Sequence, residues 1–165
     1  MRQPGFTLTK FTVALALLAL LAVAIFIFAD PAGRIQSGRN KQRLADVTQI
    51  MDALQRHRED TGQLPASIDT LPETVQIIGE NPGPCTSIEC EGQRVAATNC
   101  AITDFDTVLQ PSIGQLPLDP KSGSTHDTRY FVNRNTDGTV TVGSCERERT
   151  SVETSGSVLG TAITR

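Results

Sequence analysis

Residues 5–29 read GFTLTKFTVALALLALLAVAIFIFA, and the part from Phe11 to Ala29 contains no charged side chain. At about 1.5 Å per residue, a helix of this length spans a hydrocarbon core of about 30 Å. The run exceeds the apolar region of about 7–15 residues found in secretory signals, and Asp30-Pro31 follows it in place of a small-x-small cleavage site. A buried core helix fits poorly because the run is apolar all round. We therefore predict a membrane-spanning helix.

The composition of the 165 residues limits the remaining possibilities. The chain has 15 basic and 18 acidic residues, so it lacks the strongly basic character of a nucleic-acid-binding protein, and we expect no specific nucleic-acid partner. Beyond the N-terminal segment, the aromatic residues are Phe105, Tyr130 and Phe131. A soluble core with so few large side chains is small and gains from covalent cross-links.

The four cysteines, Cys85, Cys90, Cys100 and Cys145, all follow the apolar run. If the run carries them out of the cytoplasm, they reach an oxidising compartment and pair. Our first choice is Cys85–Cys90 with Cys100–Cys145, and the alternative is Cys85–Cys100 with Cys90–Cys145. A zinc site is the weaker interpretation, because Cys85-x4-Cys90 is a loose ligand spacing without a nearby histidine. We predict no metal ligands among them.

Basic residues on the two sides of the run give opposing indications of its orientation. Arg2 and Lys10 precede it, whereas the region from Arg34 to Arg43 holds four basic residues. Basic residues concentrate on the cytoplasmic side, so the count alone favours a cytoplasmic C-terminal part. The cysteines favour the opposite orientation, with the C-terminal part outside the cytoplasm.

Gly5-Phe6-Thr7-Leu8, placed directly before an unbroken apolar helix, resembles the N-terminus of type IV prepilins and of the pseudopilins of type II secretion and DNA-uptake machines. The resemblance implies that prepilin peptidase removes the leader, residues 1–5, by cutting after Gly5 and then methylates Phe6. Residues 6–29 would remain as a transmembrane and filament-core helix. The implied partners are other pilin or pseudopilin subunits, the peptidase, an inner-membrane assembly platform and membrane lipid. The implied location is the cytoplasmic membrane, with an extracytoplasmic head that enters a periplasmic or extracellular filament.

Lys10 departs from the family pattern. Members of the family usually carry a glutamate at the fifth position after the cut, where it is thought to pair with the terminal ammonium of a neighbour. A lysine has the wrong sign for that pairing, and an unpaired charge in an apolar filament core is costly. Some minor pseudopilins thought to sit at a filament tip also lack the glutamate, so the resemblance leaves a minor role open.

Residues 30–62 are predicted to form an amphipathic stalk helix, regular from about Ile35 to Asp60. An apolar face recurs at helical spacing through Leu44, Val47, Ile50, Met51 and Leu54. Pro31, Gly33 and Gly38 mark a weak point between this helix and the apolar run. The basic cluster Arg34 to Arg43 would lie at the membrane face or on the stalk surface. The stretch Arg43 to Pro65 resembles the same region of many pseudopilins.

Residues 63–145 are predicted to form a small globular head. Short strands are expected at Thr74–Ile78 and at Arg94–Thr98, and a helix at Thr103–Ile113 with Asp104 as its N-cap. Asp137-Gly138 predicts a hairpin between strands at Arg129–Arg134 and Thr139–Val142. The tail, residues 146–165, is expected to be a polar, mobile end, although Val158-Leu159 could add a strand. The expected fold class is α+β: a long N-terminal helix packed on a small antiparallel β-sheet, as in pilins.

The stretch Leu116-Pro117-Leu118-Asp119-Pro120, followed by Tyr130 and Asp137-Gly138, resembles the C-terminal part of major pseudopilins. Some of these bind calcium in the loop after the Asp-Pro pair. In this chain the oxygen donors would be Asp119, Ser122, Ser124 and Asp127. The alternative is a turn with ordinary side-chain capping, and we predict no obligatory cofactor.

No catalytic motif is evident in the sequence. The two histidines, His57 and His126, lie among charged or loop residues, and neither a nucleophile elbow nor a zinc-protease signature occurs. We therefore expect a structural subunit of a type IV filament system and no enzyme activity. The alternative is a single-pass, membrane-anchored extracytoplasmic binding module that does not polymerise.

Overall fold

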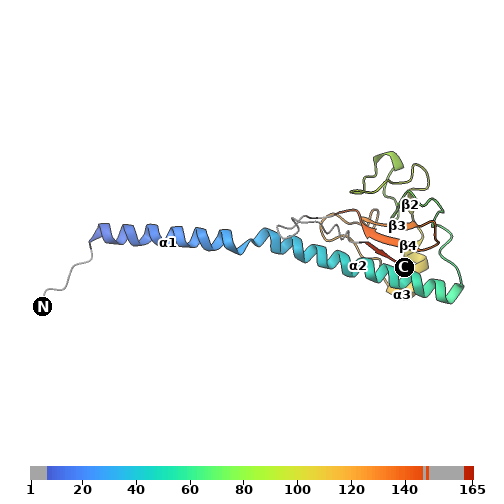
Figure 1. Cartoon of the computed structure of the whole chain (residues 1–165), viewed down its shortest axis with the longest axis horizontal. Coiled ribbons are helices and arrows are strands. Elements are labelled where there is room, and N and C mark those ends of the chain that lie inside the picture. The colour runs from blue at the N-terminus through green and yellow to red at the C-terminus, as the bar shows by residue number, and fades with distance from the viewer. Residues whose placement is uncertain (1–6, 147, 149–161) are drawn as a thin grey trace. The chain divides into compact units, whose positions relative to one another are not determined.

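The computed structural model describes residues 7–146, residue 148 and residues 162–165. The chain divides into two compact units, one up to Ile35 and one from Gln36 onward, and each is described by itself (Figure 1). The predicted leader and the Val158-Leu159 strand lie outside the described residues.

The first unit contains helix α1, Leu8–Ala29, which begins three residues before the predicted start of the apolar run. It ends at Asp30, whose backbone is left-handed with a φ of 37°, and helix α2, Pro31–Thr61, begins at the next residue. Asp30 Oδ1 accepts a hydrogen bond from the Gly33 N–H at 3.1 Å. Asp30 thus ends one helix and caps the next, and Pro31 occupies a first position that needs no N–H donor. The predicted weak point is therefore a complete break between two helices.

Helix α2 buries six side chains, but not those of the predicted stripe alone. The buried residues are Arg43, Val47, Ile50, Met51, Ala53 and Leu54. The prediction for Leu44 was wrong, since its side chain is 50% exposed. Arg43, predicted to lie on the polar surface, is fully buried instead. Positions 43, 47, 50 and 54 share one helix face, so Arg43 continues the buried stripe where Leu44 cannot.

The second unit contains a five-stranded sheet in the order β2-β1-β3-β4-β5. The strands are β1 (Gln76–Ile78), β2 (Ala101–Ile102), β3 (Tyr130–Arg134), β4 (Val140–Ser144) and β5 (Ala162–Thr164). The pair β1–β2 is parallel and the other pairs are antiparallel, so the predicted purely antiparallel sheet was wrong. The fold class is α+β, as predicted.

The β3–β4 hairpin confirms the prediction made from Asp137-Gly138. Gly138 has a φ of 82°, a conformation that glycine adopts without steric cost. Two other predictions fail. Instead of a strand at Arg94–Thr98, the structure has an isolated bridge between Val75 and Val95. The end of the tail, expected to be mobile, forms β5 and pairs with β4.

The sheet separates two hydrophobic clusters, because successive side chains of a strand point to opposite faces. On one face, Tyr130 and Val132 pack with α2 and with helix α3, Phe105–Ile113. On the other face, Phe131 packs with the cysteine-containing loop that connects β1 to β2. Figure 1 shows α2 and this loop on opposite sides of the sheet. The three predicted core aromatics are all buried.

Helix α3 begins close to its predicted start. Asp104 occupies the N-cap position, as expected, but its side chain makes no capping hydrogen bond. The helix ends at Ile113, where Gly114 adopts a φ of 72° and its N–H bonds to the Gln110 carbonyl. This helix and the loop after it border the cavity described below.

Candidate functional site

Gly5 and Phe6, the predicted processing residues, lie outside the described part of the chain. Lys10 falls in the first turn of α1, and its side chain is exposed. The first turn of a helix carries the positive end of the helix dipole, which disfavours a cation and favours a carboxylate. At the position of Lys10, the helix dipole would therefore stabilise a glutamate, the residue that prepilins usually carry there, and it disfavours the lysine.

Helix α1 presents apolar side chains to its surroundings on every face. Its window of highest hydropathy has no buried residue, and exposed side chains run from Leu8, through Leu18 in the middle, to Phe28. An exposed apolar surface of this size is unstable in water and marks a contact with lipid or protein. By length and composition, the helix could cross a membrane.

In the second unit, a buried ion pair attaches α2 to the head. Arg43 Nε lies 2.6 Å from Asp119 Oδ2, and both side chains are fully buried. Arg43 Nη2 also donates to Asp119 Oδ1 at 3.2 Å, which makes the contact bidentate. Burial raises the pKa of Asp119, but hydrogen bonds from Arg43 and from the Lys121 and Ser122 amides outweigh it, and the net pKa is lowered. The carboxylate is thus held in its charged form.

Glu148 extends this pair toward the C-terminal part of the chain. It accepts two hydrogen bonds from Arg39, at 2.5 and 2.6 Å, and lies 3.5 Å from Arg43. Asn40 Nδ2 donates to the Glu148 carbonyl at 2.6 Å. The hydrogen bond from Arg39 lowers the pKa of Glu148. Glu148, three positions after the last cysteine, is therefore attached to α2 by charge-assisted hydrogen bonds.

These contacts change the interpretation of the basic cluster Arg34 to Arg43. Two of its members, Arg39 and Arg43, face head carboxylates, so the prediction that the whole cluster lies on the surface was wrong. The spacing of Arg43 to the apolar positions 47, 50 and 54 was the signal that could have revealed its burial. The partners Asp119 and Glu148 are 76 and 109 positions away from Arg43 and Arg39, and no local pattern indicates them.

A second polar contact joins the same helix to the sheet. The buried Tyr130 hydroxyl donates to Asp46 Oδ2 at 2.6 Å. Burial and this hydrogen bond raise the pKa of Tyr130, and burial raises the pKa of Asp46. The contact satisfies a hydroxyl that would otherwise lie unpaired in the core, and it fixes the register of α2 against β3.

The four cysteines form two disulfides, Cys85–Cys100 and Cys90–Cys145. Our first choice of pairing was wrong and the alternative is confirmed. The reason lies in the sheet: Cys100 immediately precedes β2 and Cys145 follows β4, so the two are separated by β1 and β3. Each instead lies within reach of a different cysteine in the loop that covers the second face.

The loop predicted as a calcium site uses its oxygens for other contacts. Asp119 accepts hydrogen bonds from Arg43 and from the amides of Lys121 and Ser122. Asp127 accepts a hydrogen bond from the Arg129 amide at 2.8 Å and from its guanidinium at 3.3 Å. Within the described ranges, no three His, Cys, Asp or Glu residues gather in a way that could hold a metal ion. The two carboxylates of this loop each contact an arginine and cap a turn.

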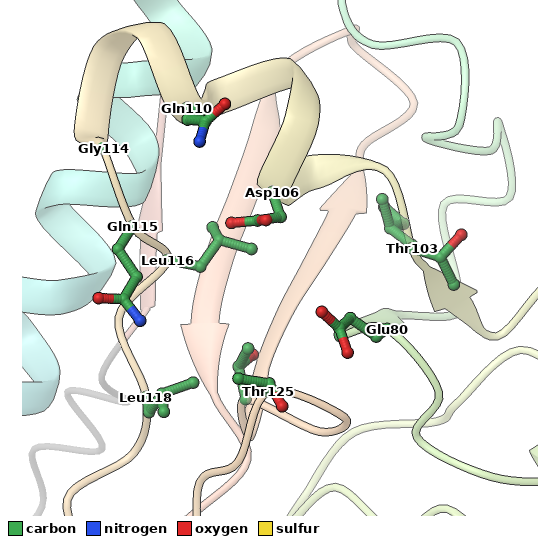
Figure 2. A pocket seen from close by; sticks show the side chains of 12 residues that line it. Glu80, Thr103, Asp106, Gln110, Gly114, Gln115, Leu116, Leu118 and Thr125 are labelled. Atoms are coloured by element: carbon green, nitrogen blue, oxygen red, sulfur yellow. The ribbon is translucent and has the colours of Figure 1, made fainter.

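A cavity of about 360 Å³ opens in the head beside α3 (Figure 2). Asp106 and Gln110 border it from α3, Glu80 follows β1, and Gln115 and Leu116 come from the loop after α3. Figure 2 shows these side chains around one common space. The volume falls in the range of small binding pockets. Nothing in the sequence indicated this cavity, because its residues come from five separate segments.

Of the two histidines, His126 is exposed and His57 is half-buried. His57 lies on α2, and His126 Nδ1 lies 3.7 Å from the Glu80 carboxylate, outside the cavity lining. That contact is an ion pair when the imidazole is protonated. The expectation that the chain is not an enzyme stays a prediction.

Comparisons with family models, with curated proteins and with solved structures found no match for this chain. The resemblance to prepilins and pseudopilins therefore rests on the residues that carry it, above all on residues 5–29.

Proposed function

We propose that this chain is a structural subunit, pilin-like or pseudopilin-like, of a type IV filament system. In this proposal, prepilin peptidase removes residues 1–5 and methylates Phe6, and α1 anchors the mature subunit in the cytoplasmic membrane. The subunit then enters a filament by packing α1 against the same helix of neighbouring copies or related subunits.

The observation that carries the proposal is α1 itself. It follows Gly5-Phe6 directly, its side chains are apolar on all faces, and none of its most apolar window is buried by the chain. A helix of this kind needs lipid or other helices around it. A filament subunit is surrounded first by lipid, in the membrane, and then by other helices, in the filament. Processing ahead of the apolar run, at Gly5, would leave the helix on the mature protein.

Two features of the second unit support the proposal, and the first of them, the disulfides, favours an extracytoplasmic head. Cys85–Cys100 and Cys90–Cys145 close two loops, and disulfides persist in oxidising compartments. The ion pairs of Arg39 and Arg43 join the helix to the head, as a subunit requires if it is extracted from the membrane as one piece. Lys10 cannot supply the carboxylate that would pair with a neighbour's terminal ammonium, so the proposal includes both shaft and minor subunits.

The substitution Gly5→Ala tests the proposal, with Gln3→Ala in the same leader as the matched control. Gly5→Ala should leave the full-length chain in the membrane and reduce the filament fraction at least about tenfold. The reason is that the retained leader keeps the charge of Arg2 ahead of α1, and this charge cannot enter an apolar core. Immunoblots of membrane and sheared-filament fractions provide the readout. Normal trimming of Gly5→Ala would contradict the proposal. An untrimmed, monomeric wild type would instead favour the membrane-anchored binding module.

A further inference from the structure

We propose that the cavity beside α3 receives the cationic end of a lysine or arginine side chain from a neighbouring copy of this chain. The inference rests on the proposed function, because assembly brings copies together, and it adds a specific contact between heads. The cavity has an acidic lining and partly apolar walls, and several basic side chains of the second unit make no ion pair with the described residues.

The cavity carries negative charge without a compensating cation in its lining. Of its twelve lining residues, Glu80 and Asp106 are the charged ones, and both are acidic. The Asp106 carboxylate makes no hydrogen bond or ion pair with any residue in the described part of the chain. Glu80 lies 3.7 Å from His126, which supplies a charge only when protonated. A cation entering the cavity therefore meets two carboxylates, and that of Asp106 has no partner among the described residues.

The walls of the cavity suit the methylene stem of a lysine or arginine as well as its charged group. Ile102, Leu116 and Leu118 contribute apolar surface, and Gln110 and Gln115, labelled in Figure 2, place amides at the border. Lysine and arginine bury their methylene stems against apolar surface while the charged group reaches polar partners. The amide oxygens and carboxylates together offer acceptors for several N–H donors.

The chain itself supplies basic side chains that lack an acidic partner. No ion pair joins an acidic residue, within the described residues of the second unit, to Lys41, Arg56, Arg58, Arg94 or Arg134. None of these five lines the cavity of its own chain. In a filament, α1 packing would hold neighbouring heads at a high effective concentration, so even a weak charge contact would be occupied.

The test reverses the cavity charge in the full chain, in membranes, and follows formaldehyde-linked oligomers on immunoblots. Glu80→Lys/Asp106→Lys should lower the oligomer fraction about tenfold, because like charges then meet at the contact. Reversing the true partner, one of the five basic residues, to Glu in the same chain should restore it. Glu59→Lys/Glu73→Lys, two exposed carboxylates away from the cavity, is the matched control and should change little.

A folding defect is excluded by two further measurements. The milder Glu80→Gln/Asp106→Asn should lower the oligomer fraction by about threefold, as loss of an exposed charge pair does. Each variant must also keep both disulfides and the Tyr130 fluorescence of the wild type. An unchanged oligomer fraction, or a loss that none of the five reversals restores, overturns the inference; the latter result would point to a free cation as ligand.

The mass of the mature N-terminus, measured on the same samples, separates this inference from the proposed function. A chain that starts at Phe6 but oligomerises independently of Glu80 and Asp106 contradicts the cavity contact alone. Oligomers that depend on these carboxylates in a chain that keeps Met1 contradict the proposed function alone. A wild-type chain that keeps Met1 and stays monomeric contradicts both.

Discussion

Helices α1 and α2 follow one another in the sequence, but they differ in how their apolar side chains are buried. The part of α2 in the second unit places Val47, Ile50 and Leu54 in a core shared with the sheet. Helix α1 has more apolar side chains than α2 and buries none of its most apolar window within the chain. The comparison teaches that apolar content does not decide where a helix packs. A helix with one apolar stripe is completed by its own chain, whereas a helix apolar on all faces needs lipid or other chains.

Substitution of Arg43 should have the largest effect on the stability of the head. This residue is a charge buried on α2, and α1 has no equivalent. Arg43→Met leaves the Asp119 carboxylate buried without its partner and should destabilise the head by about 3–5 kcal/mol. The measurement is urea unfolding in detergent micelles, followed by the fluorescence of Tyr130, the chain's one tyrosine in the absence of tryptophan.

The control for Arg43 is Arg58→Met, an exposed position on the same helix, which should change stability by about 0.5 kcal/mol or less. The double variant Arg43→Met/Asp119→Leu should be more stable than Arg43→Met, because it removes the orphaned charge. Equal stability of Arg43→Met and Arg58→Met would mean that this pair does not hold α2 to the head.

The two disulfides belong to the second unit, so their removal should affect the stability of that unit and leave α1 unchanged. Their sequence separations of 55 and 15 residues predict losses of about 4 kcal/mol for Cys90→Ser/Cys145→Ser and about 3 kcal/mol for Cys85→Ser/Cys100→Ser. The same urea titrations measure both, and the helicity of α1 in micelles should not change in either variant. A reversed order of the two losses would show that strain or residual structure, not loop length, sets their contribution.

A matched pair of truncations compares the helices directly. Ile50→Ala creates a cavity in the shared core and should cost the head about 2–5 kcal/mol. Leu18→Ala, in the middle of α1, should leave the unfolding midpoint of the head unchanged within about 0.5 kcal/mol. If Leu18→Ala destabilised the head as much as Ile50→Ala, α1 would have a packing partner inside the chain, contrary to our description.

Acid should affect the second unit through Asp119 and Glu148, whose pKa values are lowered in the folded state. A lowered pKa contributes stability above the unfolded value, which is about 3.9 for aspartate, and that contribution is lost as the pH falls through the folded pKa. Asp46, with a raised pKa, acts in the opposite sense. We expect the head to lose stability between neutral pH and pH values below about 4, and Asp119→Leu/Arg43→Met to lose less. Equal losses in both chains would contradict this assignment.

Regular patterns predicted the elements of this molecule well. Unbroken hydropathy located α1, helical periodicity located α2, and Asp137-Gly138 located the β3–β4 hairpin. Contacts between distant residues were not predictable in the same way. The parallel β1–β2 pair, the partners of Cys85 and Cys90, and the Arg43–Asp119 pair each depend on the order of strands in space, which no local pattern records.

The features of the candidate site also differ in how far the sequence predicted them. The sequence indicated the apolar helix and the processing junction that we propose, because both are continuous segments. The cavity escaped prediction, since Glu80, Asp106 and Gln115 come from separate segments that the folded sheet brings together. Arg43 is the intermediate case: its spacing placed it on the buried face, but its chemistry suggested the surface.

The mass of the mature chain distinguishes a processed filament subunit from a chain that keeps its leader. Intact-protein mass spectrometry of the protein purified from membranes reports where it begins and whether the N-terminus is methylated. Our account predicts a chain that begins at N-methylated Phe6 and retains the whole of α1. A chain that keeps Met1, or one that begins near Ala32 after loss of α1, would contradict it.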